Sequence, residues 1–458
     1  MEKHHHHERS TFSGKLGFVL SAAGASVGLG NIWRFPYLAA KYGGGIFLLI
    51  YIILALTFGY SMIIAETALG RMTRKSPVGA FGKFGKSKWL SFGGWINAVI
   101  PILIVPYYSV IGGWVIKYLI EYVKGNSQKL AEDGYFSAFI SDGTSTEICF
   151  LVFALLTLAI IFAGVRNGVE RVSKFMMPIL VFLSVLIAIY SVTRPGALAG
   201  VKYFLVPNPA NFSWMTVVAA MGQMFYSLSI AMGILVTFGS YMKRDVSIEG
   251  STTNVEIFDT AIALMAGLMI IPAVFAFSGG DPDTLQAGPA LMFITIPKVF
   301  ANMGFGTPIG IIFFLLVLMA ALTSSIALTE SAVSTFQDEL RWPRKGATVI
   351  VGIIMVILGS LSSLGYGPLA FVKIIGMQFL DFFDFLTNSV MMPIAAFATC
   401  ILISRVIGVG KIEEEVEADG GSFKRKKVFR FMIRYLCPIF TVIILLSSVA
   451  NAFGWISM

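Results

Sequence analysis

A cluster of polar and helix-breaking residues occupies residues 24–36, which read Gly-Ala-Ser-Val-Gly-Leu-Gly-Asn-Ile-Trp-Arg-Phe-Pro. The cluster lies inside an apolar segment long enough to cross a bilayer. An intact membrane helix satisfies its own backbone, so a break at this depth leaves amide and carbonyl groups that need partners. Such breaks occur where they line a cavity and bind a solute or an ion. The pattern predicts a protein that moves a small polar solute through a membrane.

A second break is expected at residues 226–233, inside the sixth apolar segment. The first and sixth segments hold corresponding places in two halves of five segments each. Paired breaks of this kind indicate inverted repeats with a binding site at their interface. Glycine also lets membrane helices pack closely, but two breaks that contain Asn31 and Ser227 favour a binding site.

The composition excludes a soluble globular protein. Hydrophobic residues make up 56% of the 458 residues and charged residues only 13%, with a mean hydropathy of +0.81. Long continuous apolar runs favour a helical bundle over a β-barrel, whose strands alternate. We predict one domain over residues 1–458 with eleven transmembrane helices, at about 16–40, 46–70, 89–123, 147–164, 169–192, 213–242, 256–278, 309–338, 346–365, 374–404 and 429–455. The loops at 193–212 and 279–308 are long enough to hold short surface helices.

The net charge of +9 comes from Lys and Arg gathered in alternate loops, which is a topology signal and no sign of nucleic-acid binding. These loops predict a multi-pass protein of the cell (plasma) inner membrane with a cytoplasmic N-terminus and an extracellular C-terminus. No cleavable signal peptide is expected. The cysteines lie in or beside apolar segments and imply neither a disulfide nor a metal framework, and the run His4–His7, a tag fragment or natural, is not expected to bind metal. The cysteines are Cys149, Cys400 and Cys437.

Together these residues resemble the neurotransmitter:sodium symporter (LeuT-like) family, over nearly the whole chain. The motifs that carry the resemblance are residues 28–36, Gly43-Gly44-Gly45, Glu66 with Gly70-Arg71, Pro106-Tyr107-Tyr108, Gly222-Gln223 and Thr323-Ser324-Ser325. Eleven spans resemble the family's bacterial branch of multi-hydrophobic amino-acid transporters. The resemblance implies an all-α membrane protein with a LeuT-type 5+5 inverted-repeat bundle and broken spans 1 and 6. Residues 16–192 form the first repeat, 213–404 the second, and 429–455 an extra span.

Two sodium ions are implied by the resemblance, and sodium as a hard cation prefers oxygen ligands. The first site, Na1, would use the Ser26 carbonyl, the Asn31 side chain, Ser227 and an oxygen of the seventh span. The second site, Na2, would use the carbonyls of Gly24, Val27 and Ala320 with the hydroxyls of Thr323 and Ser324. Hydroxyls on membrane helices often bond the preceding turn, but three consecutive ones need a further explanation.

The family usually places Asn in the seventh span, whereas the only carboxylate inside this segment is Asp259. Carboxylates at membrane depth are costly and functional by default. We therefore interpret Asp259 as an Na1 ligand that also supplies the negative charge that chloride provides in other members. Tyr51, Gln223 and Ser227 would surround it. The register of Asp259 in the span is left open.

The substrate would lie between the broken helix ends, where amides face its carboxylate and carbonyls face its ammonium. Gly28 stands where monoamine transporters of the family have aspartate, which favours an α-amino acid. Tyr108 would donate to the substrate carboxylate. The apolar wall with adaptable Met232 predicts hydrophobic L-amino acids, aliphatic and aromatic. The predicted substrate-binding residues are Ala25, Ser26, Gly28, Leu29, Gly30, Ile104, Tyr108, Tyr226, Ser227, Ser229, Met232, Ser324 and Leu328.

Two charged pairs resemble the gates of the family. Arg34 and Asp384 would close the outer side. Arg9 and Asp338 would close the cytoplasmic side with Phe12, Ser240 and Tyr241 nearby, although Arg9 also fits an ordinary positive-inside residue. Glu66 is expected to stabilise spans 1 and 6. The spacing of Gly168 and Pro178 matches a segment that unwinds in this family, or else Pro178 only kinks the fifth span.

The sequence therefore predicts a sodium-coupled symporter that imports hydrophobic amino acids by alternating access and is not an enzyme. A channel is the main alternative class, but no filter motif or ring of like charges is found. A receptor of similar fold that binds without transport is a second alternative. No nucleophile–base or metal constellation stands out. The expected partners are the amino acid and the lipid bilayer, without nucleic acid, and the oligomeric state is not predicted.

Overall fold

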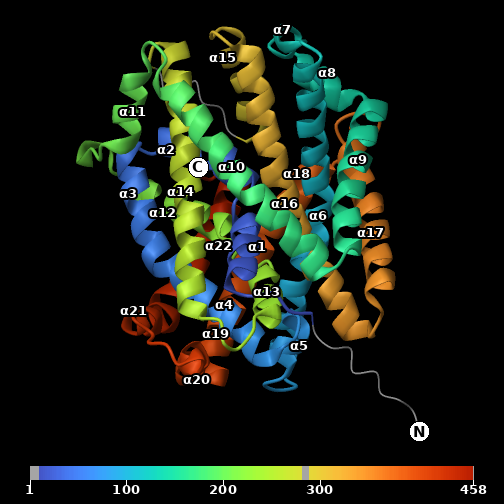
Figure 1. Cartoon of the computed structure of the whole chain (residues 1–458), viewed down its shortest axis with the longest axis vertical. Coiled ribbons are helices and arrows are strands. Elements are labelled where there is room, and N and C mark those ends of the chain that lie inside the picture. The colour runs from blue at the N-terminus through green and yellow to red at the C-terminus, as the bar shows by residue number, and fades with distance from the viewer. Residues whose placement is uncertain (1–9, 281–287, 457–458) are drawn as a thin grey trace.

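The computed structural model of the chain describes residues 10–280 and 288–456. It is all-helical, with 81% of residues in helices, and within those two ranges it has no β-strand beyond one isolated bridge between Ile374 and Met377. The long helices run side by side along the long axis of the molecule (Figure 1). The predicted all-α bundle is confirmed.

Nine continuous helices in the described ranges are long and apolar enough to cross a membrane. Several combine two α-helices through a π-helical turn, as α3 (Gly45–Leu54) joins α4 (Tyr60–Thr73). The nine helices are Gly45–Thr73 (α3 and α4), Lys88–Val123 (α6), Gly143–Phe162 (α9), Val165–Val192 (with α10, Arg171–Val192), Ile248–Ser278 (α14), Gly306–Leu340 (α16), Arg344–Leu364 (α17), Phe379–Ile407 (with α18, Phe379–Asp384, and α19, Met392–Ile401) and Lys426–Ala452 (with α21, Lys426–Phe431, and α22, Cys437–Ala452).

Two further segments are broken where the sequence predicts. Helix α1 (Lys15–Ser26) and the helix Gly30–Lys41, which includes α2 (Phe35–Lys41), are bent by 54° and together have the length and composition of one span. Helix α12 (Trp214–Ser227) and helix α13 (Ile234–Tyr241) are separated by residues 228–233, and each is too short to cross alone. The count of eleven spans and the division into inverted repeats stay predictions.

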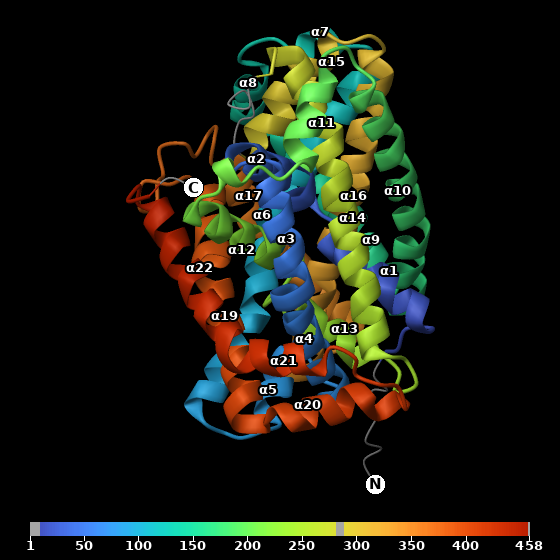
Figure 2. The same cartoon turned by 90° about the vertical axis from the view of Figure 1, so that its left-hand side faces the viewer.

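Short helices lie at the two ends of the bundle (Figures 1 and 2). Two of them, α11 and α15, occupy the long loops in which surface helices are expected. Helix α20 crosses beneath α4 at the end where the described N-terminal residues lie (Figure 2). The short helices are α5 (Pro77–Gly82), α7 (Ser127–Leu130), α8 (Tyr135–Ser141), α11 (Ala197–Leu205), α15 (Ile296–Ala301) and α20 (Val409–Val416).

The core of the bundle is built on α6 and α16, which pack against each other. In the most apolar 18-residue stretch of each helix, 83% of the residues are buried in α6 and 72% in α16. The corresponding share in Lys426–Ala452 is 28%. Apolar residues that remain exposed on the outer helices suit contact with lipid, in which exposure is not penalised. The helices that contribute to the site therefore lie at the centre, and the last helix lies at the edge.

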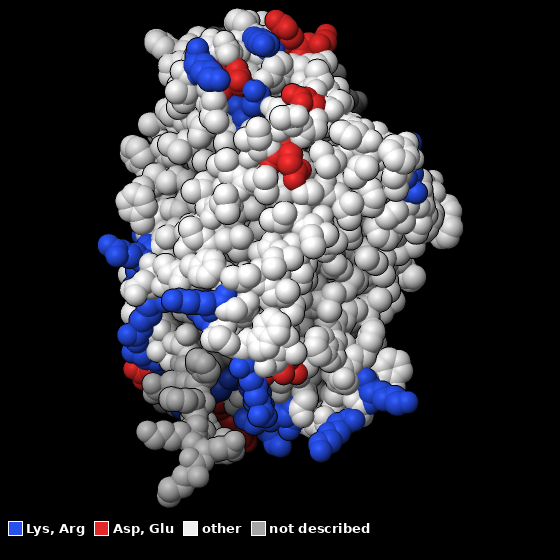
Figure 3. Space-filling model, turned by 90° about the vertical axis from the view of Figure 1, so that its right-hand side faces the viewer, with Lys and Arg blue, Asp and Glu red and all other residues white. Residues whose placement is uncertain are grey.

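On the surface that Figure 3 shows, charged side chains avoid the middle of the molecule. Figure 3 shows one face that is largely uncharged, with Lys and Arg gathered toward its lower end and a smaller group of both signs at its upper end. We call the lower end, where α5 and α20 lie, the basic end. An uncharged band between two charged ends is the pattern of a chain that spans a bilayer.

Helices α4 and α13 approach each other backbone to backbone. A Cβ atom at Gly70 would lie 2.0 Å from the Val236 carbonyl oxygen, and one at Gly239 would lie 2.3 Å from the Thr67 carbonyl oxygen. Contacts under 3.0 Å are not tolerated, so only glycine fits at either position. The two helices are thus in direct backbone contact over about one turn of each, from Thr67 to Gly70 in α4 and from Val236 to Gly239 in α13.

Candidate functional site

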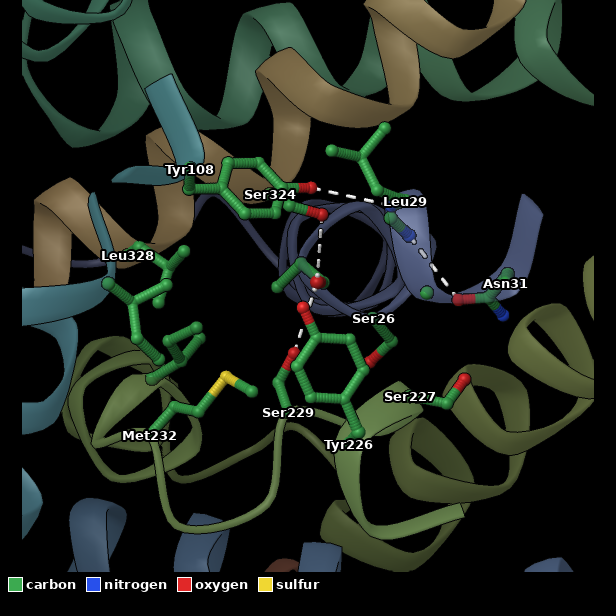
Figure 4. Close-up of a pocket in the computed structure, with 15 residues that line it drawn as sticks. Ser26, Leu29, Asn31, Tyr108, Tyr226, Ser227, Ser229, Met232, Ser324 and Leu328 are labelled. Carbon is green, nitrogen blue, oxygen red and sulfur yellow. Dashed lines mark hydrogen bonds between the residues drawn. The ribbon is translucent and has the colours of Figure 1, made fainter. Parts of the chain in front are cut away.

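A pocket lies between the two helix breaks at the centre of the bundle. All thirteen predicted substrate-binding residues line it, together with Asn31 and Ile234 (Figure 4). It measures ≈ 30 Å³, so it is almost closed in this arrangement. The structure therefore brings together, as the sequence predicts, residues of the two broken segments with residues of α6 and α16. Whether these residues bind substrate stays a prediction.

The wall of the pocket is set by how α6, α12 and α16 approach the first break. A Cβ at Gly28 would lie 2.7 Å from the Ser324 hydroxyl and 3.1 Å from the Tyr108 hydroxyl, and one at Gly30 would meet the Tyr226 ring at 2.6 Å. The Tyr108 hydroxyl accepts a hydrogen bond from the Leu29 amide at 3.4 Å (Figure 4). Glycine at these positions lets side chains of three helices reach the broken backbone.

On one side of the pocket a hydroxyl lies among backbone carbonyls. The Ser324 hydroxyl is 3.2 Å from the carbonyl oxygen of Gly24, 3.1 Å from that of Ala25 and 3.5 Å from that of Val27. One hydroxyl has a single proton to donate, so most of these oxygens are free to coordinate a cation. Four oxygens in one dry place fit a hard cation such as sodium.

Thr323, the neighbour of Ser324 on α16, bonds its own helix. Its hydroxyl lies 3.0 Å from the Met319 carbonyl oxygen and 3.1 Å from that of Ala320. A Cβ at Gly24 would touch the Thr323 Cβ at 3.2 Å, so α1 packs directly on this part of α16. The five residues predicted for Na2 therefore lie at one contact between α1 and α16, although this fit does not test their role.

On the other side of the pocket Asp259 is fully buried on α14. Its Oδ1 accepts hydrogen bonds from the Asn31 amide at 2.9 Å and the Ser227 hydroxyl at 2.8 Å, and its Oδ2 accepts one from the Tyr51 hydroxyl at 3.0 Å. The carboxylate thus sits at mid-depth of α14 against both broken spans, and the register left open by the sequence is resolved. Such a buried carboxylate suits a cation held beside it.

Gln223 is placed differently from the prediction. It is buried, but its amide donates to the Gly30 carbonyl at 3.1 Å, and it makes no hydrogen bond to Asp259. The Gly30 carbonyl also accepts the backbone amide of Phe35 in the π-helical turn Gly30–Arg34, so the glutamine side chain is its second donor. Of the residues expected around Asp259, Tyr51 and Ser227 contact it and Gln223 does not.

The break in span 6 is held by Glu66 of α4. The Glu66 carboxylate is fully buried and accepts a hydrogen bond from the Ala231 amide at 2.8 Å. Ser229 and Ala231 have φ angles of 55° and 60°, in the left-handed region that L-residues rarely adopt. The Ser229 hydroxyl donates to the Ala25 carbonyl at 3.1 Å, which links the two breaks. The expected stabilising contact of Glu66 is present for span 6.

The predicted outer gate faces a second, larger cavity of ≈ 320 Å³. Arg34 and Asp384 both line it, but they form no ion pair with each other across the described residues. The Arg34 guanidinium lies 5.4 Å from the centre of the Tyr226 ring, and Asp384 accepts from the Tyr107 hydroxyl at 3.3 Å and from Asn388. The pocket is therefore separated from this cavity by Tyr226 and not by an ion pair.

At the basic end the site is closed by packed aromatic side chains. Phe12 is buried against Phe18, Phe238 and Tyr241, and its amide donates to the Tyr241 carbonyl at 3.0 Å. The Tyr241 hydroxyl donates to Glu330 at 2.7 Å, a carboxylate that also pairs with Arg344. The structure is thus closed on this side.

The remaining predicted gate residues are only partly accounted for. Asp338 accepts a hydrogen bond from the Ser76 amide at 2.7 Å, and Ser240 is buried beside its own turn. Arg9 lies outside the described residues. The segment from Gly168 to Pro178 is helical throughout, so the structure shows no unwinding there.

Sequence reasoning missed three side chains that complete the site. Ile234, the first residue of α13, lines the pocket, and Tyr107 and Asn388 bind Asp384. Tyr107 stands next to Tyr108 in a motif already singled out, and Ile234 directly follows the second break. Asn388 lies one helical turn after Asp384, a spacing that places side chains on the same face.

The sequence model of the Sodium:neurotransmitter symporter family matches residues 9–131 and 136–454 of the chain. The chain belongs to this family. It is therefore a membrane transporter that uses sodium and not an enzyme, in agreement with the helical bundle and its two breaks.

Individual relatives agree with this assignment. The chain is 34% identical over 445 residues to the sodium-dependent transporter YhdH of Bacillus subtilis, covering 96% of this chain and 97% of that protein. It is 31% identical to the sodium-dependent transporter MJ1319 of Methanocaldococcus jannaschii, covering 89% and 84%. The sodium- and chloride-dependent GABA transporter 2 of mouse is 27% identical, covering 90% and 75%.

Among solved structures, the transporter is similar to MhsT in complex with L-phenylalanine. The two share 35% sequence identity and a TM-score of 0.84, covering 96% of this chain and 100% of MhsT. A likeness of this extent confirms the predicted LeuT-type bundle.

Proposed function

We propose that the transporter is a symporter that couples sodium to the import of hydrophobic L-amino acids by alternating access. The observation that carries this proposal is a pocket enclosed by two different groups of oxygen atoms. Carbonyls of α1 surround the Ser324 hydroxyl on one side, and Asp259 lies on the other. Sites of this kind, between two interrupted helices, bind a solute and its coupling ions together.

Two sodium ions fit this pocket best. The Na2 ion would take carbonyl oxygens of Gly24, Val27 and Ala320 with the hydroxyls of Thr323 and Ser324. The Na1 ion would lie beside Asp259 with Ser26, Asn31 and Ser227. Because Asn31 points its amide nitrogen at Asp259, its amide oxygen, which accepts only a 3.4 Å hydrogen bond from the Gly28 amide, is the atom that would coordinate a cation. A buried carboxylate next to the ion offsets its charge, which neutral oxygens alone do not do.

The substrate proposal rests on the shape and polarity of the pocket. Gly28 lets the Ser324 and Tyr108 hydroxyls approach the first break, where the Tyr108 hydroxyl would donate to a substrate carboxylate, and no basic side chain lines the pocket. Ile104, Met232 and Leu328 make the rest apolar. The solved structure of MhsT holds L-phenylalanine, and a substrate of that size would enter this pocket only as Met232 and neighbouring side chains change rotamer.

Chloride independence is the most specific part of the proposal. Asp259 supplies a fixed negative charge at the Na1 side, bonded by Tyr51, Asn31 and Ser227. With that charge in place an added chloride would be repelled and is not needed to balance sodium.

The orientation proposal follows the charges. Lys and Arg gather at the basic end, which would face the cytoplasm of a cell with the larger cavity open to the outside. The N-terminus would then be cytoplasmic and the C-terminus extracellular. In this arrangement the larger cavity would be open to the outside, Tyr226 separates it from the pocket, and the cytoplasmic path is closed, which is an outward-facing occluded step of the cycle.

Uptake into proteoliposomes tests the proposal directly. Labelled leucine should accumulate above its outside concentration when sodium is higher outside, and the accumulation should collapse when a sodium ionophore is added. A receptor gives binding without accumulation, and a channel gives equilibration without concentration. Either result contradicts the proposal.

Competition by unlabelled amino acids tests the substrate class. Leucine and tryptophan should compete with the label, because each buried methylene contributes about 0.8 kcal/mol. Met232→Phe should weaken tryptophan more than leucine, since overpacking is costlier for the larger side chain. Competition by glutamate or lysine alone would show that the pocket is not selective for apolar side chains.

A further inference from the structure

A connecting segment at the basic end binds two of the helices on which the pocket is built. Residues 408–425, which we call the strap, join the span Phe379–Ile407 to the span Lys426–Ala452 (Figure 2). Within it α20 packs an apolar face against α4, with Ile412 and Val416 buried. The ionic contacts of the strap reach α4 and α14, and the arginine of α4 that takes part also binds the connection between α13 and α14.

Arg71 at the end of α4 makes the first ionic contact. Its side chain is 1% exposed, and its Nε lies 2.6 Å from the Glu415 carboxylate of the strap. One terminal nitrogen donates to the Val246 carbonyl at 2.7 Å, and the other donates to the Glu415 carbonyl. A single buried guanidinium therefore joins α4, the strap and the segment that follows α13, and it has no water to replace these partners.

Arg425 at the other end of the strap makes the second contact. Its guanidinium binds Glu256 of α14 at 2.7 Å and 3.2 Å, and it lies 3.5 Å from the centre of the Tyr60 ring. Its backbone amide donates to Glu249 at 3.1 Å, and the Tyr60 hydroxyl donates to the same carboxylate at 2.8 Å. This is a bidentate pair reinforced by an aromatic face, which holds a fixed geometry better than a simple surface pair.

We propose that Arg71 and Arg425 are positioning residues of the transport cycle, through which the strap holds the ends of α4, α13 and α14 in the arrangement closed at the basic end. Neither residue touches the pocket. Arg71 binds the Val246 carbonyl in the segment that follows α13, the helix that carries Tyr241 of the aromatic closure. Gly70 of α4 also packs directly against α13, so the position of α4 fixes that of α13. Opening this end moves these elements away from their present neighbours, so it must work against the two arginine contacts. The inference rests on the alternating-access part of the proposed function.

The test measures opening at the basic end without any substrate. Ser331 of α16 is fully buried, and its hydroxyl is 3.3 Å from that of Thr237 on α13, so it becomes accessible only when these helices part. Ser331→Cys is labelled with a bulky charged maleimide in the full-length purified protein. The three native cysteines are buried and free, and the protein without Ser331→Cys gives the background rate.

Arg425→Gln in this background should raise the labelling rate about tenfold, because it removes charge-assisted hydrogen bonds that exist only in the closed arrangement. Arg425→Lys keeps the charge and should restore most of the protection. Arg430→Gln is the matched control: Arg430 pairs with Glu413 of the strap at 2.7 Å, and among the described residues its side chain has no hydrogen bond or ion pair with α4 or α14. Burial acts to raise the pKa of Glu413, but its pairs with Arg430 and Lys426 outweigh that and lower it, so this control pair is also ionised.

Equal labelling rates in Arg425→Gln and the parent would overturn the proposal. A rise in the labelling rate of Arg430→Gln as large as that of Arg425→Gln would also overturn it, because it would show that any lost ion pair of the strap loosens the protein. If Arg425→Gln does not fold, Tyr60→Phe removes the hydroxyl bonded to Glu249 and keeps the ring, and it should raise labelling about threefold. No rise in Tyr60→Phe would then be the contradicting result. Because labelling needs neither sodium nor amino acid, a failed uptake experiment and a failed strap experiment are distinguishable.

Discussion

The two helix breaks are satisfied in opposite ways. At residues 27–29 the break in span 1 leaves carbonyl oxygens of Gly24, Ala25 and Val27 around one hydroxyl of α16. At residues 228–233 the break in span 6 gives its Ala231 amide to a buried carboxylate, Glu66, and adopts left-handed conformations. The first break exposes oxygens that would coordinate a cation under the proposed function, whereas the second is a fixed turn held by a neighbouring helix. A broken span thus serves either as a ligand set or as a rigid wall.

The largest effect is expected at the span 1 break. Replacing Thr323 and Ser324 together by Ala removes two hydroxyl ligands from the Na2 site, and it should weaken sodium-dependent binding by about 100-fold. The measurement is binding of labelled leucine at increasing sodium. Ser325→Ala is the control, because the Ser325 hydroxyl bonds Thr157 away from the pocket at 3.1 Å. Unchanged sodium affinity in the double variant would remove the basis for the Na2 site.

The next effect concerns the carboxylate that contacts both breaks. Asp259→Ser should make transport depend on chloride or abolish it, because the fixed negative charge beside Na1 is lost. Uptake is compared in chloride and in gluconate for the parent and the variant. The parent should transport equally in both media. A parent that stops without chloride contradicts the role given to Asp259.

A smaller effect is expected on the span 6 side. Glu66→Leu leaves the buried Ala231 amide without an acceptor, and it should lower the free energy of unfolding by about 1–3 kcal/mol. Glu66→Gln keeps an acceptor oxygen and should lower it much less. The stability of both variants is measured by thermal unfolding in detergent, in which the labelling of buried cysteines reports the unfolded fraction. Equal losses in the two variants would show that the amide contact is not what stabilises the turn.

The smallest effect is expected from relieving the backbone strain at Ala231 in that turn. Ala231→Gly removes a left-handed strain of about 1–2 kcal/mol, which the greater freedom of glycine in the unfolded chain offsets by about 0.5–1 kcal/mol. The unfolding temperature should therefore stay the same or rise slightly, with sodium affinity unchanged. A clear fall in stability would mean that the turn is held by the Ala231 methyl group and not by its backbone.

Local patterns in the sequence located the two breaks, whereas the residues of the pocket were predicted from the family resemblance. Gly, Asn and Pro inside an apolar run locate the first break, and Ser229 to Gly233 locate the second. Asp259 was found because a lone carboxylate in an apolar segment is rare. What it contacts was only partly predictable: Gln223 turns to the Gly30 carbonyl, a choice set by side-chain direction and not by spacing.

Contacts between distant loops were beyond the sequence. Arg71 and Glu415 are 344 positions apart, and Arg425 and Glu256 are 169 apart. Charged residues in loops serve as topology signals, so their type and position give no sign that they bind one another. Only the packing of the strap across the ends of the helices brings them together.

The contact of α4 with α13 through Gly70 and Gly239 has a mechanical consequence. Helices that touch through side chains can shift against each other by rotamer changes, whereas a backbone-to-backbone contact offers no such compliance. The part of span 6 beyond its break and the adjoining part of span 2 therefore behave as a single rigid body. Because Glu66 of α4 also binds the Ala231 amide, the turn at residues 228–233 moves with this body, and displacement during transport is taken up at the contacts of the body with its other neighbours.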